Sequence, residues 1–198
     1  MGQDPTPLSS VCVFCGSSDL AAPSLLEDAR RLGEHLASDG LRLIYGGGGV
    51  GLMGACAIAA HAAGGDVLGI IPEFLKIKER RLDVVNTIVV TSMHERKQMM
   101  FEKSDSFVVL PGGIGTLEEI VELLSWRRLD LHAKPVVFYS PDGFWEPLFA
   151  LFQHTVDARL TPPDFMKSWV VVETVDEIVP ALRAWDLKSG AVSLKGLT

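Results

Sequence analysis

The stretch at residues 107–119 constrains the fold of this chain more than any other. Residues 107–110 are an unbroken apolar run, which predicts a strand buried on both faces, as in a parallel sheet. Pro111 ends that strand because it has no N–H to give to a ladder. Three glycines in residues 112–115 then let the backbone turn sharply and bring its amides close to a ligand.

A helix is expected after this glycine loop. Thr116 is a residue type that caps helix N-termini, and apolar residues recur after it at helical spacing as far as Leu124. A glycine loop between a strand and a helix directs unpaired N–H groups, and the positive end of the helix dipole, at one point. The stretch therefore predicts a site for an anion such as phosphate, with Glu119 as the nearest acidic group.

Strands and helices alternate along the rest of the chain. Further strands are expected at 11–14, 43–45, 67–71, 88–90, 136–139 and 169–172. Further helices are expected at 24–39, after the loop at 46–54 as far as 63, at 93–103, at 145–158 and at 175–185. This alternation predicts an α/β fold with a doubly wound, mostly parallel sheet of about seven strands, flanked by helices and binding ligands at the strands' carboxyl ends. One domain is expected at 9–185, with an irregular segment at 73–86 and flexible tails at 1–8 and 186–198.

Composition limits the function classes. The 198 residues are 47% hydrophobic and 22% charged, which fits one α/β domain with a sizeable core. The net charge of -7 argues against a protein that wraps nucleic acid, although a local anion site is compatible with it. No apolar run is long enough to span a bilayer, and the first residues lack the apolar core of a signal peptide, so a cytoplasmic protein is expected.

The three cysteines are Cys12, Cys15 and Cys56. Cys12 and Cys15 form a C-x-x-C pair, but Cys12 falls inside an expected strand and no second pair completes a zinc site. We expect buried, reduced thiols with a structural role, and neither a metal nor a redox function.

A second glycine loop competes for the ligand. Residues 46–51 satisfy the G-x-G-x-x-G spacing, as do residues 49–54, and both follow a strand and open a helix. Glu73 comes after the next strand, where the acidic residue of a dinucleotide site would be sought. This pattern favours a nicotinamide or flavin cofactor, or only tight packing of strand against helix. The loop at 111–116 has no place in the dinucleotide account, which favours a mononucleotide held by two glycine loops.

Five motifs together resemble one protein family. They are C-G-S-S at 15–18, Y-G-G-G at 45–48, G-L-M-G at 51–54, M-H-E-R-K at 93–97 and P-G-G-I-G-T-L-E-E at 111–119. The last reproduces the P-G-G-x-G-T-x-x-E signature of the Lonely Guy (LOG) proteins, and the resemblance extends from Val11 to about Trp185. That family comprises cytokinin-activating nucleoside 5'-monophosphate phosphoribohydrolases, often mislabelled in the past as lysine decarboxylases. The resemblance implies a Rossmann-like fold and a homodimer with the active site near the subunit interface; no cofactor is expected.

Site residues follow from the resemblance, position by position. Arg96 and Glu119 would be the catalytic pair, and Glu79, in a segment that aligns poorly with the plant pattern, would contact the nucleotide. The other substrate-binding residues that the motifs suggest are Ser17, Gly47, Gly48, Lys97, Gly112, Gly113, Ile114, Gly115, Thr116 and Ser125. Ser125 stands where plant members often have threonine, a difference that preserves the hydroxyl group.

Cleavage of an N-glycosidic bond needs groups of this kind. Breaking the C1'–N9 bond develops positive charge on the ribose, so a carboxylate beneath the sugar lowers the barrier. Glu119 suits that role, or it holds the ribose hydroxyls and activates water; the sequence leaves these roles open. Arg96 can pair with phosphate bidentately or orient Glu119. His94 is more typical of a structural residue near a helix end than of a general acid.

Simpler interpretations exist for the same residues. Residues 116–119 have the spacing of a capping box, which on spacing alone favours a cap for Glu119. The same spacing recurs at 24–27, 92–95 and 174–177. The adjacent glycine loop and the family resemblance favour catalysis for Glu119 instead. A helix arginine such as Arg96 is most often solvated, and its replacement would then change stability by less than about 0.5 kcal/mol.

Cofactor chemistry has little support in the sequence. Met93, Met99 and Met100 are more typical of a core than of a cofactor site. Lys97 and Lys103 are candidates for a Schiff base, but nothing else indicates pyridoxal phosphate, so decarboxylase chemistry is rejected.

The main hypothesis is hydrolysis of the N-glycosidic bond of AMP or N6-prenylated AMP, which releases the free base and ribose 5-phosphate. An NAD(P)-dependent oxidoreductase is the alternative enzyme. A nucleotide sensor or carrier on the same fold is the alternative without catalysis, and it would need neither Arg96 nor Glu119. The presence of both residues favours an enzyme.

Overall fold

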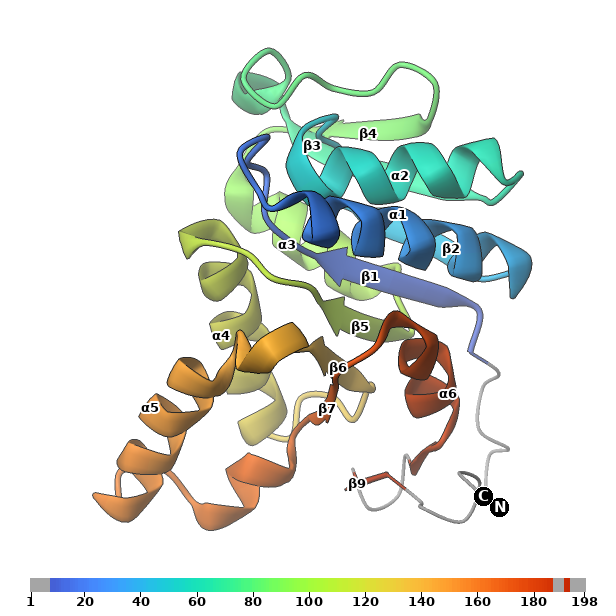
Figure 1. The fold of residues 1–198 in the computed structure, drawn as a ribbon. Coiled ribbons are helices and arrows are strands. Elements are labelled where there is room, and N and C mark those ends of the chain that lie inside the picture. The colour runs from blue at the N-terminus through green and yellow to red at the C-terminus, as the bar shows by residue number, and fades with distance from the viewer. Residues whose placement is uncertain (1–7, 187–190, 193–198) are drawn as a thin grey trace, which may run out of the picture.

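The computed structural model describes residues 8–186 and 191–192 (Figure 1). Seven strands form one sheet in the order β4-β3-β2-β1-β5-β6-β7, and every pairing in it is parallel. The strands are β1 (Ser10–Phe14), β2 (Arg42–Tyr45), β3 (Val67–Pro72), β4 (Asn86–Val90), β5 (Ser106–Val109), β6 (Val136–Tyr139) and β7 (Val170–Val172). The helices are α1 (Pro23–Ser38), α2 (Gly51–Ala62), α3 (Met93–Glu102), α4 (Ile114–Arg128), α5 (Glu146–Asp157) and α6 (Ile178–Arg183). The predicted α/β fold with a doubly wound sheet is confirmed.

The two faces of the sheet carry separate cores, because successive residues of a strand point to opposite faces. Val11 and Val13 of β1 pack in a core with residues of α1, α2 and α6. Cys12 and Phe14, from the same strand, pack in a core with residues of α3, α4 and α5. Figure 1 shows α1 and α2 in front of the sheet and α3 behind it. Burial on both faces explains why the strands are apolar runs rather than alternating patterns.

Most predicted boundaries agree with the structure to within one or two residues, but three helices differ. Helix α2, expected only after the loop at 46–54, already begins at Gly51, because the last residues of that loop form its first turn. Helix α4 begins at Ile114, and its N-cap is Gly113, so the prediction of Thr116 as N-cap is wrong. The extended backbone of Gly113 (φ −101°, ψ −152°) aims its carbonyl into the helix, where it accepts from Leu117 N at 3.0 Å. The helix predicted at 175–185 is a 3-10 turn, Val175–Glu177, followed by the short α6.

The winding of the chain reverses between β1 and β5. From β1 the strands step outward through β2, β3 and β4; the chain then returns to β5 and steps the other way through β6 and β7. Loops at the carboxyl ends of the two central strands diverge at such a point, which leaves the crevice where open α/β sheets bind ligands. Here the two loops are joined at their base, since Gly16 N donates to Pro111 O at 3.0 Å.

Residues between β3 and β4 are irregular, as predicted. They comprise a 3-10 turn, Glu73–Leu75, and a series of turns and bends that ends at β4.

Among the residues that the structure describes, no helix is both long and apolar enough to cross a membrane.

The tails predicted at 1–8 and 186–198 lie largely outside the described residues. The described part includes β8 (Trp185–Asp186), which pairs in antiparallel fashion with β9 (Ala191–Val192). Leu8 packs against the core on the side of α1.

Candidate active site

A cavity of about 360 Å³ opens at the crevice between the loops that follow β1 and β5. Its walls come from those two loops, from the segment between β3 and β4, and from the first turns of α2, α3 and α4. The lining residues are Cys15, Gly16, Ser17, Ser18, Met53, Leu75, Glu79, Met93, Arg96, Gly113, Ile114, Gly115, Thr116 and Glu119. Both residues expected to be catalytic therefore lie in one cavity with six of those expected to bind substrate.

The N-terminus of α4 is open to this cavity. The first amides of any α-helix have no acceptor within the helix, and no side chain caps those of α4 in the described structure. A side-chain carbon at Gly113 or Gly115 would meet no atom within 4 Å, so the approach to the amides is clear. Gly112, by contrast, allows close packing, because a side chain there would clash with the buried Thr116 hydroxyl. Together the free amides and the helix dipole make an anion site.

The glycine loop before α2 is closed. Gly51 N donates to Asp19 Oδ1 and Leu52 N to Gly16 O, both at 3.0 Å. Gly49 N donates to Glu79 O at 2.8 Å. These amides are thus occupied by protein acceptors and are not offered to a phosphate.

Gly47 and Gly48 of that loop lie outside the cavity lining. Gly47 has a left-handed backbone (φ 81°), and a side chain there would come within 2.9 Å of Ile71 Cβ. A side chain at Gly48 would come equally close to Met53 Cε. Glu73, the candidate ribose acid of a dinucleotide, instead pairs with Lys76 at 2.9 Å on the surface. The features that suggested a dinucleotide therefore serve packing and surface pairing in the fold.

Arg96 is buried, with only 4% of its surface exposed, so the interpretation of it as a solvated helix charge is wrong. It points from the first turn of α3 across the end of β2, where Nη2 donates to Gly46 O at 3.0 Å. The same nitrogen lies 3.7 Å from Glu79 Oε2. The burial of a helix arginine against residues far away in the chain cannot be predicted from the sequence of the helix itself. Glycine at position 46 makes room for the guanidinium, because a side chain there would overlap it and displace Arg96.

Glu119 lies one turn and a half into α4 and lines the cavity. Burial raises the pKa of its carboxyl from the ordinary 4.5 to about 7. The charge of Arg96 opposes this rise in the pKa of Glu119, whereas Glu118 and Glu79 add to it. A carboxyl with a pKa near neutrality inside a cavity is characteristic of acid–base and electrostatic catalysis.

The capping interpretation of Glu119 is wrong, because α4 is capped by Gly113 and begins before the predicted box. The box predicted at 24–27 is also absent, since α1 begins at Pro23 with no side-chain cap. At 92–95 the Ser92 hydroxyl does accept from Glu95 N at 3.1 Å. The full capping box is present only at 174–177 among the predicted positions. Spacing alone therefore does not identify a cap.

Glu79 is brought to the cavity from the irregular segment between β3 and β4. Its side chain is 16% exposed, and burial raises the pKa of its carboxyl against the opposing charges of Arg96 and Lys78. Oε2 has no hydrogen-bond partner in the described structure. The cavity thus holds two carboxylates of raised pKa beside one buried guanidinium, and a ligand hydroxyl group can supply the missing donor to Glu79.

Lys97 and Ser125 lie outside the cavity lining. Lys97 of α3 pairs with Glu118 and, at 2.9 Å, with Glu122 of α4. Its side chain is only 12% exposed, so in this chain it links the helices that carry the two catalytic candidates. Ser125 is exposed, farther along α4.

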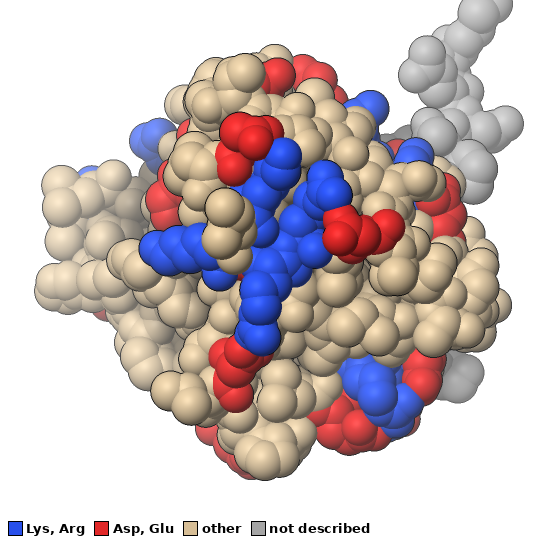
Figure 2. Space-filling view, turned by 90° about the horizontal axis from the view of Figure 1, so that it is seen from above, with Lys and Arg blue, Asp and Glu red and all other residues tan. Residues whose placement is uncertain are grey.

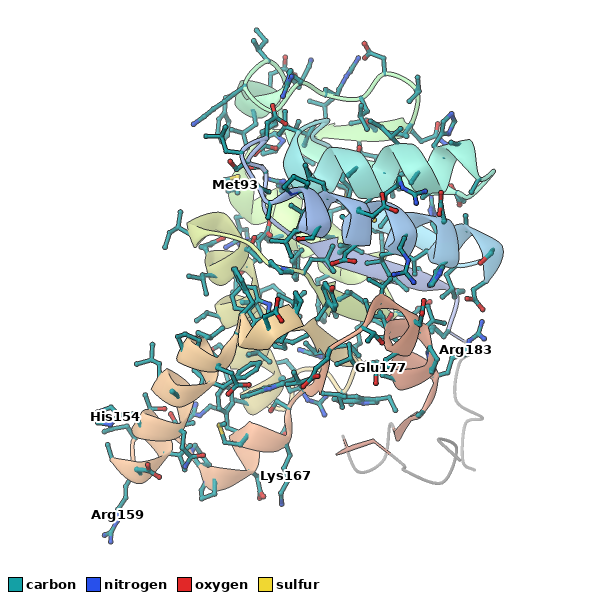
Figure 3. All side chains as sticks on the ribbon, viewed as in Figure 1. Met93, His154, Arg159, Lys167, Glu177 and Arg183 are labelled. Atoms are coloured by element: carbon teal, nitrogen blue, oxygen red, sulfur yellow. The ribbon has the colours of Figure 1, made fainter. Side chains whose placement is uncertain are left out.

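Several lining residues were missed by the sequence reasoning. Ser18 and Cys15 belong to the C-G-S-S motif, in which only Ser17 is predicted to be a site residue. Met93 was predicted to be core but lies half-buried on the cavity wall, where its sulfur is 3.9 Å from Arg96 Nη1. Figure 3 labels Met93 at the start of α3, in the upper half of the view, far from Arg159 and Lys167 near the bottom.

The cysteines are free and buried, as predicted. Burial raises the pKa of the Cys15 thiol well above its ordinary value and that of Cys56 to about 12, so neither is a thiolate at neutral pH. Within the described residues, no group of three or more His, Cys, Asp or Glu side chains is arranged to hold a metal ion.

Comparison with solved structures identifies the same fold. The chain superposes on the molybdenum cofactor carrier protein of Chlamydomonas reinhardtii with a TM-score of 0.67 and 24% identity, covering 89% of this chain and 96% of that one. At this identity the likeness concerns the fold.

Comparison with known sequences is more specific. A probable cytokinin riboside 5'-monophosphate phosphoribohydrolase of Oryza sativa subsp. japonica is 43% identical over 86% of this chain and 78% of its own length. A cytokinin riboside 5'-monophosphate phosphoribohydrolase of Arabidopsis thaliana is 41% identical over 88% of this chain and 77% of its own. A family model described as "possible lysine decarboxylase" matches residues 53–182. The chain therefore belongs to this family, the Lonely Guy (LOG) proteins.

Proposed function

We propose that this protein hydrolyses the N-glycosidic bond of AMP or N6-prenylated AMP, a cytokinin riboside 5'-monophosphate. Water would add its oxygen to C1' of the ribose while the C1'–N9 bond breaks and its electron pair leaves with the base. The base takes up one proton, and the products are the free base and ribose 5-phosphate. The observation that carries the proposal is one cavity that combines an open helix N-terminus with two carboxyls of raised pKa.

The 5'-phosphate would bind at the N-terminus of α4. Amides of residues 114–116 lack acceptors within the helix, and the helix dipole favours an anion by about 0.3–1 kcal/mol before hydrogen bonds are counted. That remote binding energy would fix the nucleotide so that the ribose reaches Glu119, five residues after the start of the helix.

Glu119 would act on the ribose. Ionised, it would stabilise the positive charge that develops at C1', and its pKa of about 7 also lets it accept a proton from the attacking water. Arg96 would offset the negative charge of the two carboxylates, since it lies 3.7 Å from Glu79 and its charge opposes the raised pKa of both groups. Glu79 would accept hydrogen bonds from the ribose hydroxyls.

The relatives support this activity rather than the alternatives. Proteins named cytokinin riboside 5'-monophosphate phosphoribohydrolases match at 41% and 43% identity. An NAD(P)-dependent oxidoreductase is disfavoured by the occupied amides of the loop before α2. A carrier without catalysis would share the fold of the molybdenum cofactor carrier protein, but it would not require Glu119 and Arg96 in one cavity.

The proposal includes a cytoplasmic homodimer that binds no nucleic acid. Support for the dimer comes from apolar side chains that α4 exposes: Val121 and Ile114 are 46% and 84% exposed. Leu129 and Leu131, at and after the end of that helix, are 56% and 66% exposed. The free, buried thiols support a cytoplasmic location. The net charge of -7 supports a protein that does not bind nucleic acid.

The test is incubation of the protein with AMP, N6-prenylated AMP, adenosine and NAD, followed by chromatography of the products. The proposal predicts free base and ribose 5-phosphate from one or both monophosphates, and little turnover of adenosine. Equal turnover of adenosine and AMP would refute the phosphate anchor. Tight binding of NAD without hydrolysis of AMP would favour the oxidoreductase, and binding of AMP without hydrolysis would favour the carrier.

A further inference from the structure

Glu79 holds its place in the cavity without regular secondary structure around it. It lies in the run of turns between β3 and β4, yet its side chain is only 16% exposed and approaches Arg96 to 3.7 Å. Its contact with Arg96 is too long for a hydrogen bond, and Oε2 has no other partner in the described structure. Hydrogen bonds of the carboxyl group therefore do not fix its position, which depends on the backbone of Glu79.

The backbone at Glu79 is held by an unusual turn. Arg80, the next residue, has a left-handed conformation (φ 47°), which is uncommon for a long side chain and reverses the chain directly after Glu79. Gly49 N donates to both carbonyls of the turn, Glu79 O at 2.8 Å and Arg80 O at 3.0 Å. Such a conformation persists where surrounding contacts enforce it.

Asp19 supplies a contact of this kind. Its Oδ2 accepts from Arg80 Nη2, and its Oδ1 accepts from Gly51 N at 3.0 Å. One carboxylate thus joins three segments: the loop after β1, the start of α2 and the turn that carries Glu79. Ser17 and Ser18, just before Asp19, line the cavity, as does Glu79 in that turn. Asp19 therefore links the loop after β1 directly to the turn that carries Glu79.

The other basic residues of this segment make no such link. Figure 2 shows basic side chains gathered on the face that carries residues 73–85, with acidic side chains at their edges. Lys76 pairs with Glu73, and Arg81 pairs with Asp83, each within the segment itself. Among the described ion pairs of these basic residues, the pair of Arg80 with Asp19 is the one that reaches another part of the chain.

We propose that Asp19 and Arg80 are positioning residues, whose ion pair fixes the turn that presents Glu79 to the cavity. The proposal rests on the proposed function, because the value of a fixed Glu79 lies in its contact with the ribose of a bound nucleotide. Neither residue lines the cavity, so each acts through Glu79.

The test variants separate the ion pair from the other contacts. Asp19→Asn keeps an oxygen for Gly51 N and removes the charge that faces Arg80. Arg80→Gly removes the ion pair and keeps the left-handed turn, which glycine adopts without strain. Asp39→Asn is the matched control, because Asp39 pairs with Arg183 at 2.7 Å on the surface, away from the cavity lining.

The first readout is hydrogen exchange of residues 73–85, which needs no activity. We expect exchange in this segment to be faster in Asp19→Asn and in Arg80→Gly than in the parent, and unchanged in Asp39→Asn. Parent-like exchange in both Asp19→Asn and Arg80→Gly would overturn the proposal. This readout decides the role of the ion pair even if no variant, the parent included, hydrolyses AMP, in which case the proposed function fails separately.

The second readout is hydrolysis of AMP in a double-mutant cycle with Glu79→Gln. Loss of positioning should lower kcat/KM by about tenfold to a hundredfold in Asp19→Asn. In the Glu79→Gln background the same change should cost less than about twofold, because the group being positioned is already altered. Independent, multiplying losses would overturn the proposal, since Asp19 would then act through something other than Glu79.

Discussion

The two glycine loops differ in what occupies their amides, although both join a strand to a helix. Before α2, the amides of Gly51 and Leu52 are bound by Asp19 and by Gly16 O. Before α4, the first amides are open to a cavity, and side chains added at Gly113 or Gly115 would meet nothing within 4 Å. Similar local sequences thus give one loop for packing and one for a ligand.

The sixth residue of each helix shows the same difference. In α2 this position is Cys56, which is 2% exposed in the core between helix and sheet. In α4 it is Glu119, which lines the cavity and has a pKa of about 7. A glycine loop therefore becomes a functional site only where its amides are unoccupied and the helix behind it presents a reactive group.

The largest effect is expected from Arg96, which contacts the loop before α2 and lines one cavity with Glu119 of α4. It donates to Gly46 O, lies 3.7 Å from Glu79, and its charge opposes the rise in the pKa of Glu119. Arg96→Ala should lower AMP turnover by about 10²–10³-fold, and loss of its buried partners should lower the free energy of unfolding by about 1–3 kcal/mol. Kinetics and urea unfolding measure the two effects, with Arg128→Ala on the exposed side of α4 as control. Normal turnover in Arg96→Ala would remove it from the active site.

Glu119→Gln tests the contrast between α4 and α2, because it makes the sixth residue of α4 uncharged, as in α2. Glutamine keeps the shape but carries no negative charge and cannot act as a base. Turnover of AMP should therefore fall by about 10²-fold or more, with binding of AMP retained. Product chromatography and thermal melting with AMP measure this, and Glu102→Gln on α3 is a control outside the cavity lining. If Glu119→Gln hydrolyses AMP like the parent, the catalytic carboxylate is to be sought at Glu79.

The same substitution should change how stability depends on pH. The folded-state pKa of Glu119, about 7, lies above the ordinary 4.5, so between these values the folded protein binds more protons than the unfolded chain. Stability is then highest below pH 4.5 as far as this group is concerned, and it falls as pH rises towards 7. Above that pH the penalty reaches up to about 3 kcal/mol.

Glu119→Gln has no such penalty. Its free energy of unfolding relative to that of the parent, measured by urea unfolding, should therefore be higher at pH 8 than at pH 5. This outcome differs from the loss of under about 1 kcal/mol that would follow from a helix cap. If the difference in free energy of unfolding between the two proteins is the same at pH 5 and at pH 8, the Glu119 carboxyl is not desolvated.

A pair of alanine substitutions compares the space around the two loops. The added carbon of Gly54→Ala in α2 would approach the backbone of Gly49 to 2.5 Å, and overpacking of this kind costs about 1–3 kcal/mol. Gly115→Ala in α4 meets nothing within 4 Å and should be neutral or stabilising by up to about 1 kcal/mol. Thermal unfolding of both variants measures the difference. Equal destabilisation would mean that the α4 loop is as closely packed as the α2 loop.

Much of this fold is predictable from local pattern. The apolar runs identified every strand of the main sheet. The inner strands β1, β2, β3, β5 and β6 are largely apolar because they are buried on both faces, and the partly exposed edge strands β4 and β7 still carry short apolar runs. The prediction of Thr116 as the N-cap of α4 is wrong, because both Thr116 and Gly113 are suitable N-cap residues and the choice between them depends on the backbone after Pro111. Which glycine loop is open depends on Asp19 and Gly16, and both lie more than 30 residues before α2 in the sequence.

The candidate site was predictable mainly through motifs. Glu119 and Arg96 were identified because they stand in motifs that resemble the family. The burial of Arg96 was missed, because its partner Gly46 lies 50 residues away in the chain. Glu79 lies in a segment without periodicity, whose course depends on the turn at Arg80 and on contacts with Gly49. Local sequence carries no signal for contacts of this kind.

The most direct test of the account is an amide NMR titration with ribose 5-phosphate, the phosphate-bearing product. The account predicts that the largest shifts occur at the amides of Gly113, Ile114 and Gly115, with little change at Gly47 and Gly48. Shifts concentrated in residues 46–51, with the α4 loop unaffected, would contradict it and would make the loop before α2 the phosphate site.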